Sequence, residues 1–194
     1  MQLIRLTDED ALILVDLQND FLPEGRLPVP SGDEVIPVAN AYINYFHKKS
    51  RPVFATRDWH PRGHCSFNAA GGIWPQHCVA DTEGSGFAAG LKLSSEDCVI
   101  SKGTAQDRDA YSGFEGTDLH NRLENFGVKR LFIGGLALDV CVLNTVIDAL
   151  DLGYEVFLLT DASRAVNVQE GDGDKAIESM RSRGVQMLKM AQLQ

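Results

Sequence analysis

The sequence predicts an α/β protein with three layers, α/β/α, built around a six-stranded, mostly parallel sheet of the Rossmann-like kind. Its β-rich apolar runs are continuous rather than alternating, which is typical of strands buried on both faces. Amphipathic runs with helical spacing separate them, as expected for helices that cover a parallel sheet. With 194 residues and 44% hydrophobic content, the chain is expected to fold as one domain over residues 1–194.

Six short apolar runs are the predicted strands, and the first of them, Ala11–Val15, leads directly into Asp16. The other five are residues 52–56, 98–101, 131–133, 155–159 and 185–188. Predicted helices cover residues 33–50, 117–126, 140–152 and 173–183. Thr117 is a suitable residue to cap the second helix, and glycines at 127, 153 and 184 are placed to end helices.

One region, at about residues 57–97, departs from this alternation. It is rich in Gly, His, Pro and Trp and follows the second predicted strand. A loop region of this length inside a compact domain is usually functional. We therefore expect an elaborated loop that carries part of a site.

Composition excludes several classes of partner. The formal net charge is -9, so the chain repels nucleic acid and anionic membranes. No apolar run approaches the roughly 18 residues of a membrane span, and the acidic first ten residues do not resemble a signal peptide. The four cysteines form no Cys-x-x-Cys pair. From these features we expect a reduced, cytoplasmic protein. Separately, we expect a homo-oligomer that acts on a small-molecule substrate.

Polar residues follow four of the predicted strands, where ligands bind in open parallel sheets. Asp16 ends the first strand, the segment 57–60 follows the second, Lys102 follows the third, and Cys141 follows the fourth after a short turn. We expect these residues to converge in one pocket.

Cys141 is the predicted nucleophile. A thiol at a strand-to-helix turn lies at the positive end of the helix, which favours the thiolate. Asp16 can remove the thiol proton, and Lys102 can balance the charge of that carboxylate. Taken singly, each has a simpler interpretation: a small buried thiol, a turn residue and a solvated lysine.

A metal site is predicted in the loop region from one carboxylate and three imidazoles. Asp58, His60, His64 and His77 suit zinc, with iron or manganese as alternatives. Asp58 and His60 lie two residues apart, so an extended segment would direct both to one side. Two other interpretations stay open: histidines that only form hydrogen bonds, and a structural zinc site that includes the neighbouring Cys65 and Cys78.

Six segments together give the chain a family resemblance that covers nearly its whole length. They are Val15–Phe21, Thr56–Pro61, Trp74–Cys78, Lys102–Gly103, Tyr111–Phe114 and Gly135–Val142. In these segments the chain resembles the nicotinamidase/pyrazinamidase branch of the isochorismatase-like cysteine hydrolases. The resemblance implies a six-stranded parallel α/β fold.

The resemblance also implies roles for the residues that catalyse the reaction. Asp16, Lys102 and Cys141 match the family's catalytic triad. The backbone N–H groups of Ala137 and Cys141 match its oxyanion hole, and a cis peptide is implied between Leu136 and Ala137. At Leu138 the chain departs from the small hydroxyl residue that is common in the family.

Further roles concern the metal and the substrate. Asp58, His60 and His77 match the metal ligands, and His64 resembles an additional histidine ligand of some members. The residues implied to flank a pyridine ring are Phe21, Trp74 and Tyr111.

The activity implied is metal-dependent hydrolysis of nicotinamide to nicotinate and ammonia through a thioester, with pyrazinamide as a second substrate. Such an activity would serve NAD salvage. Two alternatives remain: another amide or ureide hydrolase of the superfamily, and a non-catalytic scaffold stabilised by metal.

Overall fold

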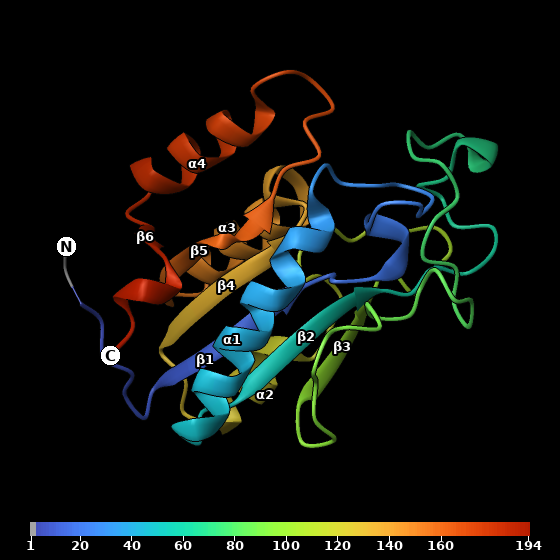
Figure 1. Ribbon diagram of the computed structural model, residues 1–194. Helices are drawn as coiled ribbons and strands as arrows, with labels where there is room; N and C mark the ends of the chain where they lie inside the picture. Colours follow the sequence, from blue (N-terminus) through green and yellow to red (C-terminus); the bar gives the residue numbers. More distant parts are fainter. Residues whose placement is uncertain (1–2) are drawn as a thin grey trace.

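A twisted six-stranded sheet forms the centre of the computed structural model, which describes residues 3–194 (Figure 1). The predicted sheet is confirmed, and each of its strand pairs is parallel. The strands are β1 (Asp10–Val15), β2 (Val53–Asp58), β3 (Cys98–Lys102), β4 (Arg130–Leu136), β5 (Glu155–Arg164) and β6 (Gln186–Leu188).

The strand order is β3-β2-β1-β4-β5-β6. The order reverses between β1 and β4, and ligands of such sheets bind beyond the strand ends at this switch point. Asp16 follows β1, and Cys141 lies five residues after the last residue of β4. The topology therefore places both at the switch point.

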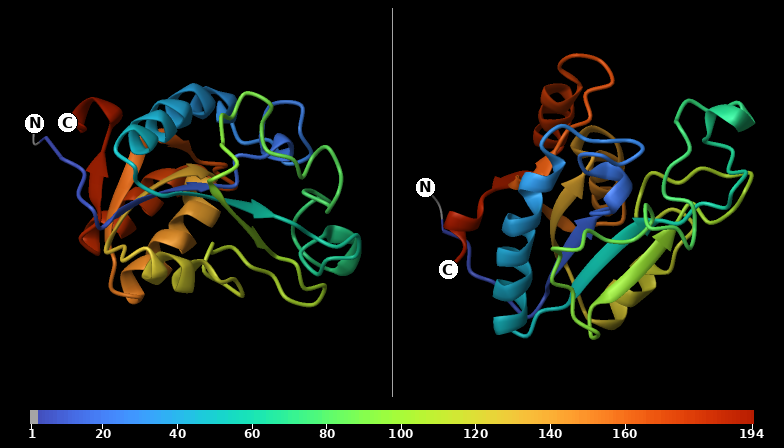
Figure 2. Two further views of the ribbon diagram at one scale, coloured as in Figure 1. Left: turned by 90° about the horizontal axis from the view of Figure 1, so that it is seen from below. Right: turned by 45° about the vertical axis from the view of Figure 1, so that its right-hand side comes forward.

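Helices cover the two faces of the sheet unequally (Figure 2). One face packs against α1 (Val35–Lys48). The other packs against α2 (Leu119–Asn125), α3 (Leu143–Asp151) and α4 (Asp172–Ser182). All six residues of β1 are buried, and the side chains of its five apolar residues, Ala11–Val15, enter the two cores in turn. This double burial explains the continuous apolar runs.

Helix ends follow the sequence closely, with two differences. Gly127, Gly153 and Gly184 all have positive φ values at the ends of helices, as expected. Helix α2 begins at Leu119, whose N–H donates to the Thr117 hydroxyl at 3.3 Å. The region predicted to be helical from residue 140 starts instead as a π-helical turn, Leu138–Val142, and continues as α3.

The chain between β2 and β3 folds back over the strand ends without long regular structure. Its regular elements are a short 3₁₀ turn, Asn68–Ala70, and two bridges that pair His60 with Val79 and Phe67 with Trp74. In Figure 2 this region extends beyond the carboxyl ends of β2 and β3. Further 3₁₀ turns cover Asn19–Phe21, Gly32–Glu34 and Met190–Gln192. No helix within residues 3–194 has the length and apolar character that crossing a membrane requires.

Candidate active site

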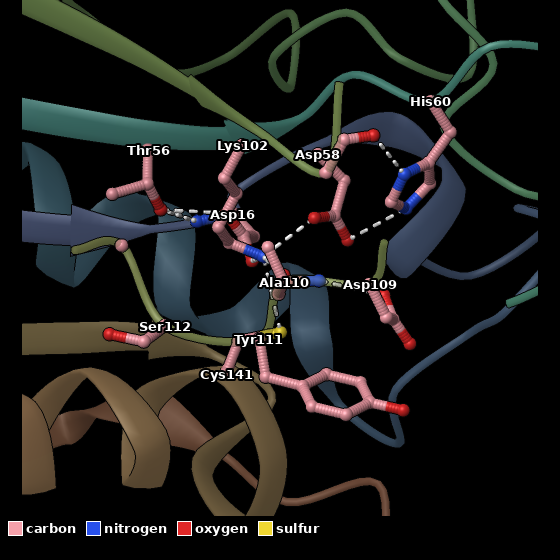
Figure 3. A network of polar contacts seen from close by, with 12 residues as sticks. Asp16, Thr56, Asp58, His60, Lys102, Asp109, Ala110, Tyr111, Ser112 and Cys141 are labelled. Atoms are coloured by element: carbon pink, nitrogen blue, oxygen red, sulfur yellow. Dashed lines mark hydrogen bonds and ion pairs between the residues drawn. The ribbon is translucent and has the colours of Figure 1, made fainter. Parts of the chain in front are cut away.

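The carboxyl ends of β1, β3 and β4 bring Asp16, Lys102 and Cys141 together (Figure 3). Asp16 leaves β1 with a φ of +50°, Lys102 is the last residue of β3, and Cys141 lies in the π turn after β4. All three side chains are buried. The convergence predicted from the sequence is thus present in the structure.

The Lys102 ammonium group contacts two buried carboxylates of the site. Its Nζ lies 2.9 Å from Asp16 Oδ2 and 2.6 Å from Asp58 Oδ1. It also donates to the Ala110 carbonyl at 3.2 Å and approaches the Cys141 sulfur at 3.5 Å. A fully buried ammonium group is costly unless it is paired, and here two carboxylates offset that cost.

Asp16 is positioned to act on the thiol. Its carboxylate and the Cys141 sulfur belong to a cluster whose potential ligand atoms lie within 4.8 Å of one another. The Thr56 hydroxyl donates to Oδ1 at 2.6 Å. Oδ2 lies close to Lys102 yet accepts no aligned hydrogen bond from the described residues. This oxygen is therefore available to receive a proton.

Burial is the largest influence on the pKa values of the Cys141 thiol and the Asp16 carboxyl group. It raises the pKa of the Cys141 thiol well above its ordinary value, despite the opposing effect of Lys102. Burial also raises the pKa of Asp16, and the nearby Asp58 adds to that rise. The thiol has to lose its proton to a base, and Asp16 is beside it.

A second cluster consists of Asp58, His60 and His77, whose potential ligand atoms also lie within 4.8 Å of one another. Asp58 Oδ2 is 3.5 Å from His60 Nε2 and 3.8 Å from His77 Nε2. Burial acts to raise the pKa of Asp58, but Lys102 and the two imidazoles reverse this and hold it below its usual range. One carboxylate and two imidazoles at this spacing fit a divalent metal such as zinc.

Backbone carbonyls fix the orientation of both imidazoles. His60 Nδ1 is 2.9 Å from the Gly103 carbonyl, and His77 Nδ1 is 2.8 Å from the Pro75 carbonyl. Each Nδ1–H donates outward, which leaves each Nε2 lone pair directed at the cluster. Outer partners of this kind orient the histidine ligands of metal sites.

His64 lies against this cluster without joining it. Its ring stacks on that of His60, with centroids 4.1 Å apart. Both ring nitrogens have other partners: Nδ1 is 2.7 Å from the Ser66 hydroxyl, and Nε2 is 3.1 Å from the Arg108 carbonyl. A role for His64 as a fourth ligand stays a prediction. Within residues 3–194, Cys65 and Cys78 also fall outside both clusters.

One pocket, lined by aromatic side chains, is bordered by Cys141 and by all three residues of the second cluster, whereas Asp16 and Lys102 are not among the residues that line it. The predicted residues Phe21, Trp74 and Tyr111 are all in its wall. The Trp74 indole N–H donates to the Tyr111 hydroxyl at 3.0 Å, which fixes one ring against the other. Ala137 and Cys141 also line the pocket, and the peptide between Leu136 and Ala137 is cis, as the resemblance implied.

Three polar residues of the site were not identified from the sequence. Thr56 binds Asp16, as described above. Gln18 accepts from the Asp58 N–H at 2.7 Å and donates to the Asp58 carbonyl at 2.8 Å, so it fixes the backbone of that residue. Asp109 lies in the pocket wall. Gln18 and Thr56 were within the recognised segments, but nothing in the sequence gave them a role.

Comparison with known proteins finds the same family that the six sequence segments resemble, over most of the chain. The isochorismatase domain model matches residues 10–192. A nicotinamidase from Escherichia coli is 37% identical to this chain, and the match covers 93% of this chain and 95% of that protein.

Solved structures agree with the sequence relatives. The crystal structure of the Pyrococcus horikoshii pyrazinamidase in complex with zinc is 48% identical, has a TM-score of 0.90, and matches over 94% of this chain and 99% of its own. The structure of PnC1 from L. infantum in complex with nicotinate is 35% identical, has a TM-score of 0.91, and matches over 99% of this chain and 98% of its own. The chain belongs to the isochorismatase family.

Proposed function

We propose that this protein is a metal-dependent amidohydrolase that converts nicotinamide and water to nicotinate and ammonia, and that it also hydrolyses pyrazinamide. One observation carries the proposal. A buried thiol with an adjacent carboxylate and ammonium shares one aromatic-lined pocket with a carboxylate and two oriented imidazoles. The relatives named above include a nicotinamidase and a structure with bound nicotinate.

The first half of the reaction acylates the thiol. Asp16 takes the proton of Cys141 as the sulfur attacks the carboxamide carbon. The backbone N–H groups of Ala137 and Cys141 stabilise the oxyanion, and one such donor is worth about 3 kcal/mol. Asp16 then gives its proton to the departing nitrogen, so ammonia leaves and a thioester remains.

The second half regenerates the enzyme. Asp16 removes a proton from water as the water oxygen attacks the thioester carbon, and the proton returns to the departing sulfur. Lys102 keeps the Asp16 and Asp58 carboxylates together during both halves, because it is bound to both.

Asp58, His60 and His77 would hold the divalent metal, with zinc as the expected ion. When bound, the metal supplies a Lewis-acidic position for the pyridine nitrogen. Phe21, Trp74 and Tyr111 enclose the ring, so that the carboxamide faces Cys141. We include His64 as a fourth ligand, a role that requires its Nε2 to leave the Arg108 carbonyl.

The test is ammonia release from nicotinamide by purified protein, with metal content measured on the same samples. We expect wild-type protein to be active, Cys141→Ala to be inactive but metal-loaded, and His60→Ala to lose metal. Normal turnover by Cys141→Ala would overturn the mechanism. A metal-loaded wild type that releases no ammonia would instead favour another amide or ureide substrate.

A non-catalytic scaffold predicts different behaviour: an inert Cys141, and unfolding on removal of metal. Rapid alkylation of one thiol that is lost in Cys141→Ala would contradict it. We further propose that the enzyme is a cytoplasmic homo-oligomer, which analytical ultracentrifugation and cell fractionation would test.

A further inference from the structure

We propose that Asp109 is a specificity residue that disfavours the anionic product and so promotes its release. This inference rests on the proposed function, because that reaction turns a neutral carboxamide into a carboxylate. The mechanism above assigns Asp109 no role, although the residue lines the same pocket as Cys141 and Tyr111.

The position of Asp109 is set by its neighbour on the chain. The carbonyl of Ala110 accepts a hydrogen bond from Lys102, which fixes this segment against the catalytic residues. Asp109 Oδ1 accepts the adjacent Ala110 N–H, at 3.0 Å, and the carboxylate also interacts with the Tyr111 side chain. In Figure 3 its carboxylate points away from the Lys102 amine, on the side of the chain where the Tyr111 ring lies.

The charge of Asp109 is not neutralised by the protein. Lys102 pairs with both Asp16 and Asp58, whereas Asp109 has no ion pair with a Lys or Arg within residues 3–194. The described residues that line the pocket include no Lys or Arg either. Asp109 therefore presents an unpaired negative charge in the wall of the pocket.

The electrostatic influence of Asp109 reaches the site. Burial raises the pKa of Tyr111, and the Asp109 carboxylate adds to that rise. A nicotinate carboxylate beside Cys141 would experience the same negative charge, whereas the neutral carboxamide would not. In the metal-loaded pocket, Asp109 offsets positive charge that would otherwise retain the product.

The test compares two variants that remove one negative charge each from the same segment. Asp109→Asn keeps the shape and the hydrogen-bond acceptor, and Asp107→Asn is the matched control at an exposed position. By calorimetry, we expect Asp109→Asn to bind nicotinate roughly three- to tenfold more tightly than the wild type does. This difference in affinity should be smaller at high salt. The KM for nicotinamide should change by less than about twofold, because a neutral ligand feels little of the charge.

Asp109→Glu retains the charge and should keep the wild-type affinity for nicotinate. Three results would each overturn the inference. Asp109→Asn could bind nicotinate with unchanged affinity, it could change the binding of nicotinate and nicotinamide equally, or Asp107→Asn could show the same change. Ammonia release by the wild type separates the two proposals. Failure of that reaction overturns the proposed function as well, whereas a failed charge effect in an active enzyme overturns only the role of Asp109.

Discussion

Lys102 Nζ donates to Asp58 Oδ1 at 2.6 Å, so the ammonium group of the proposed catalytic triad is also bound to the carboxylate of the proposed metal site. The two residues are register partners, because β2 and β3 pair Asp58 directly with Lys102. The nucleophile and the metal site are therefore coupled through one buried ion pair, and a change in either should be detectable in the other.

Replacing Lys102 by Met should damage stability, metal binding and catalysis together. The change leaves Asp16 and Asp58 buried without their shared cation, and the loss of one partner of a buried pair costs about 3–5 kcal/mol. Urea denaturation and metal analysis would measure the first two effects. Wild-type metal affinity in a folded Lys102→Met protein would contradict the coupling.

Thr56→Val should move the acid limb of kcat/KM to higher pH. Asp16 acts as a base only when ionised, and burial already raises its pKa, so activity is lost at a higher pH than for an ordinary aspartate. The Thr56 hydrogen bond lowers that pKa, and removing it should raise the pKa further. Thr56→Ser should restore the wild-type profile. Metal content measured at each pH would separate this effect from metal loss, and an acid limb that does not move would argue against Asp16 as the base.

Gly103→Ala should weaken metal binding by displacing His60. A Cβ at Gly103 would lie 2.4 Å from His60 Cε1, and the φ of +59° also disfavours alanine. We expect a loss in metal affinity of about 10- to 100-fold, as for other disturbed outer partners of metal ligands. Gly116→Ala is the control, because its φ is +69° and no atom lies within 4 Å of the added Cβ. Equal metal affinity in both variants would show that His60 tolerates the contact.

Gln18→Leu should destabilise the fold more than the loss of one exposed hydrogen bond does. It would leave the Asp58 N–H and carbonyl, and the Ser85 carbonyl, without their present partner, at about 1–3 kcal/mol for each unsatisfied group. Asn19→Leu removes one exposed hydrogen bond and serves as the comparison. Similar urea midpoints for the two variants would contradict this role of Gln18.

The sequence predicted the sheet and most of the site because both depend on local patterns. The β1 run is apolar at every position that two cores require, and Asp16, Lys102 and Cys141 follow predicted strands at the edge where ligands bind. Asp58, His60 and His77 were identifiable as residue types suited to metal.

Contacts between particular pairs of side chains could not be predicted from local patterns. The contact between Lys102 and Asp58 depends on strand register, and that between Thr56 and Asp16 depends on two adjacent strand ends. His64 has the right side chain, but its ring nitrogens are engaged by Ser66 and Arg108, which only the folded chain brings near. The raised pKa of Cys141 follows from burial, which outweighs the opposing effect of the Lys102 ammonium group.

The supports of His60 and His77 are main-chain oxygens of Gly103 and Pro75. Every amino acid carries such an oxygen, so exchanging the supporting residue does not delete the acceptor. The path of the backbone, rather than a partner side chain, sets the orientation of each imidazole. A substitution at either supporting position therefore moves an imidazole only by bending the backbone or through contact with the new side chain, as expected for Gly103→Ala.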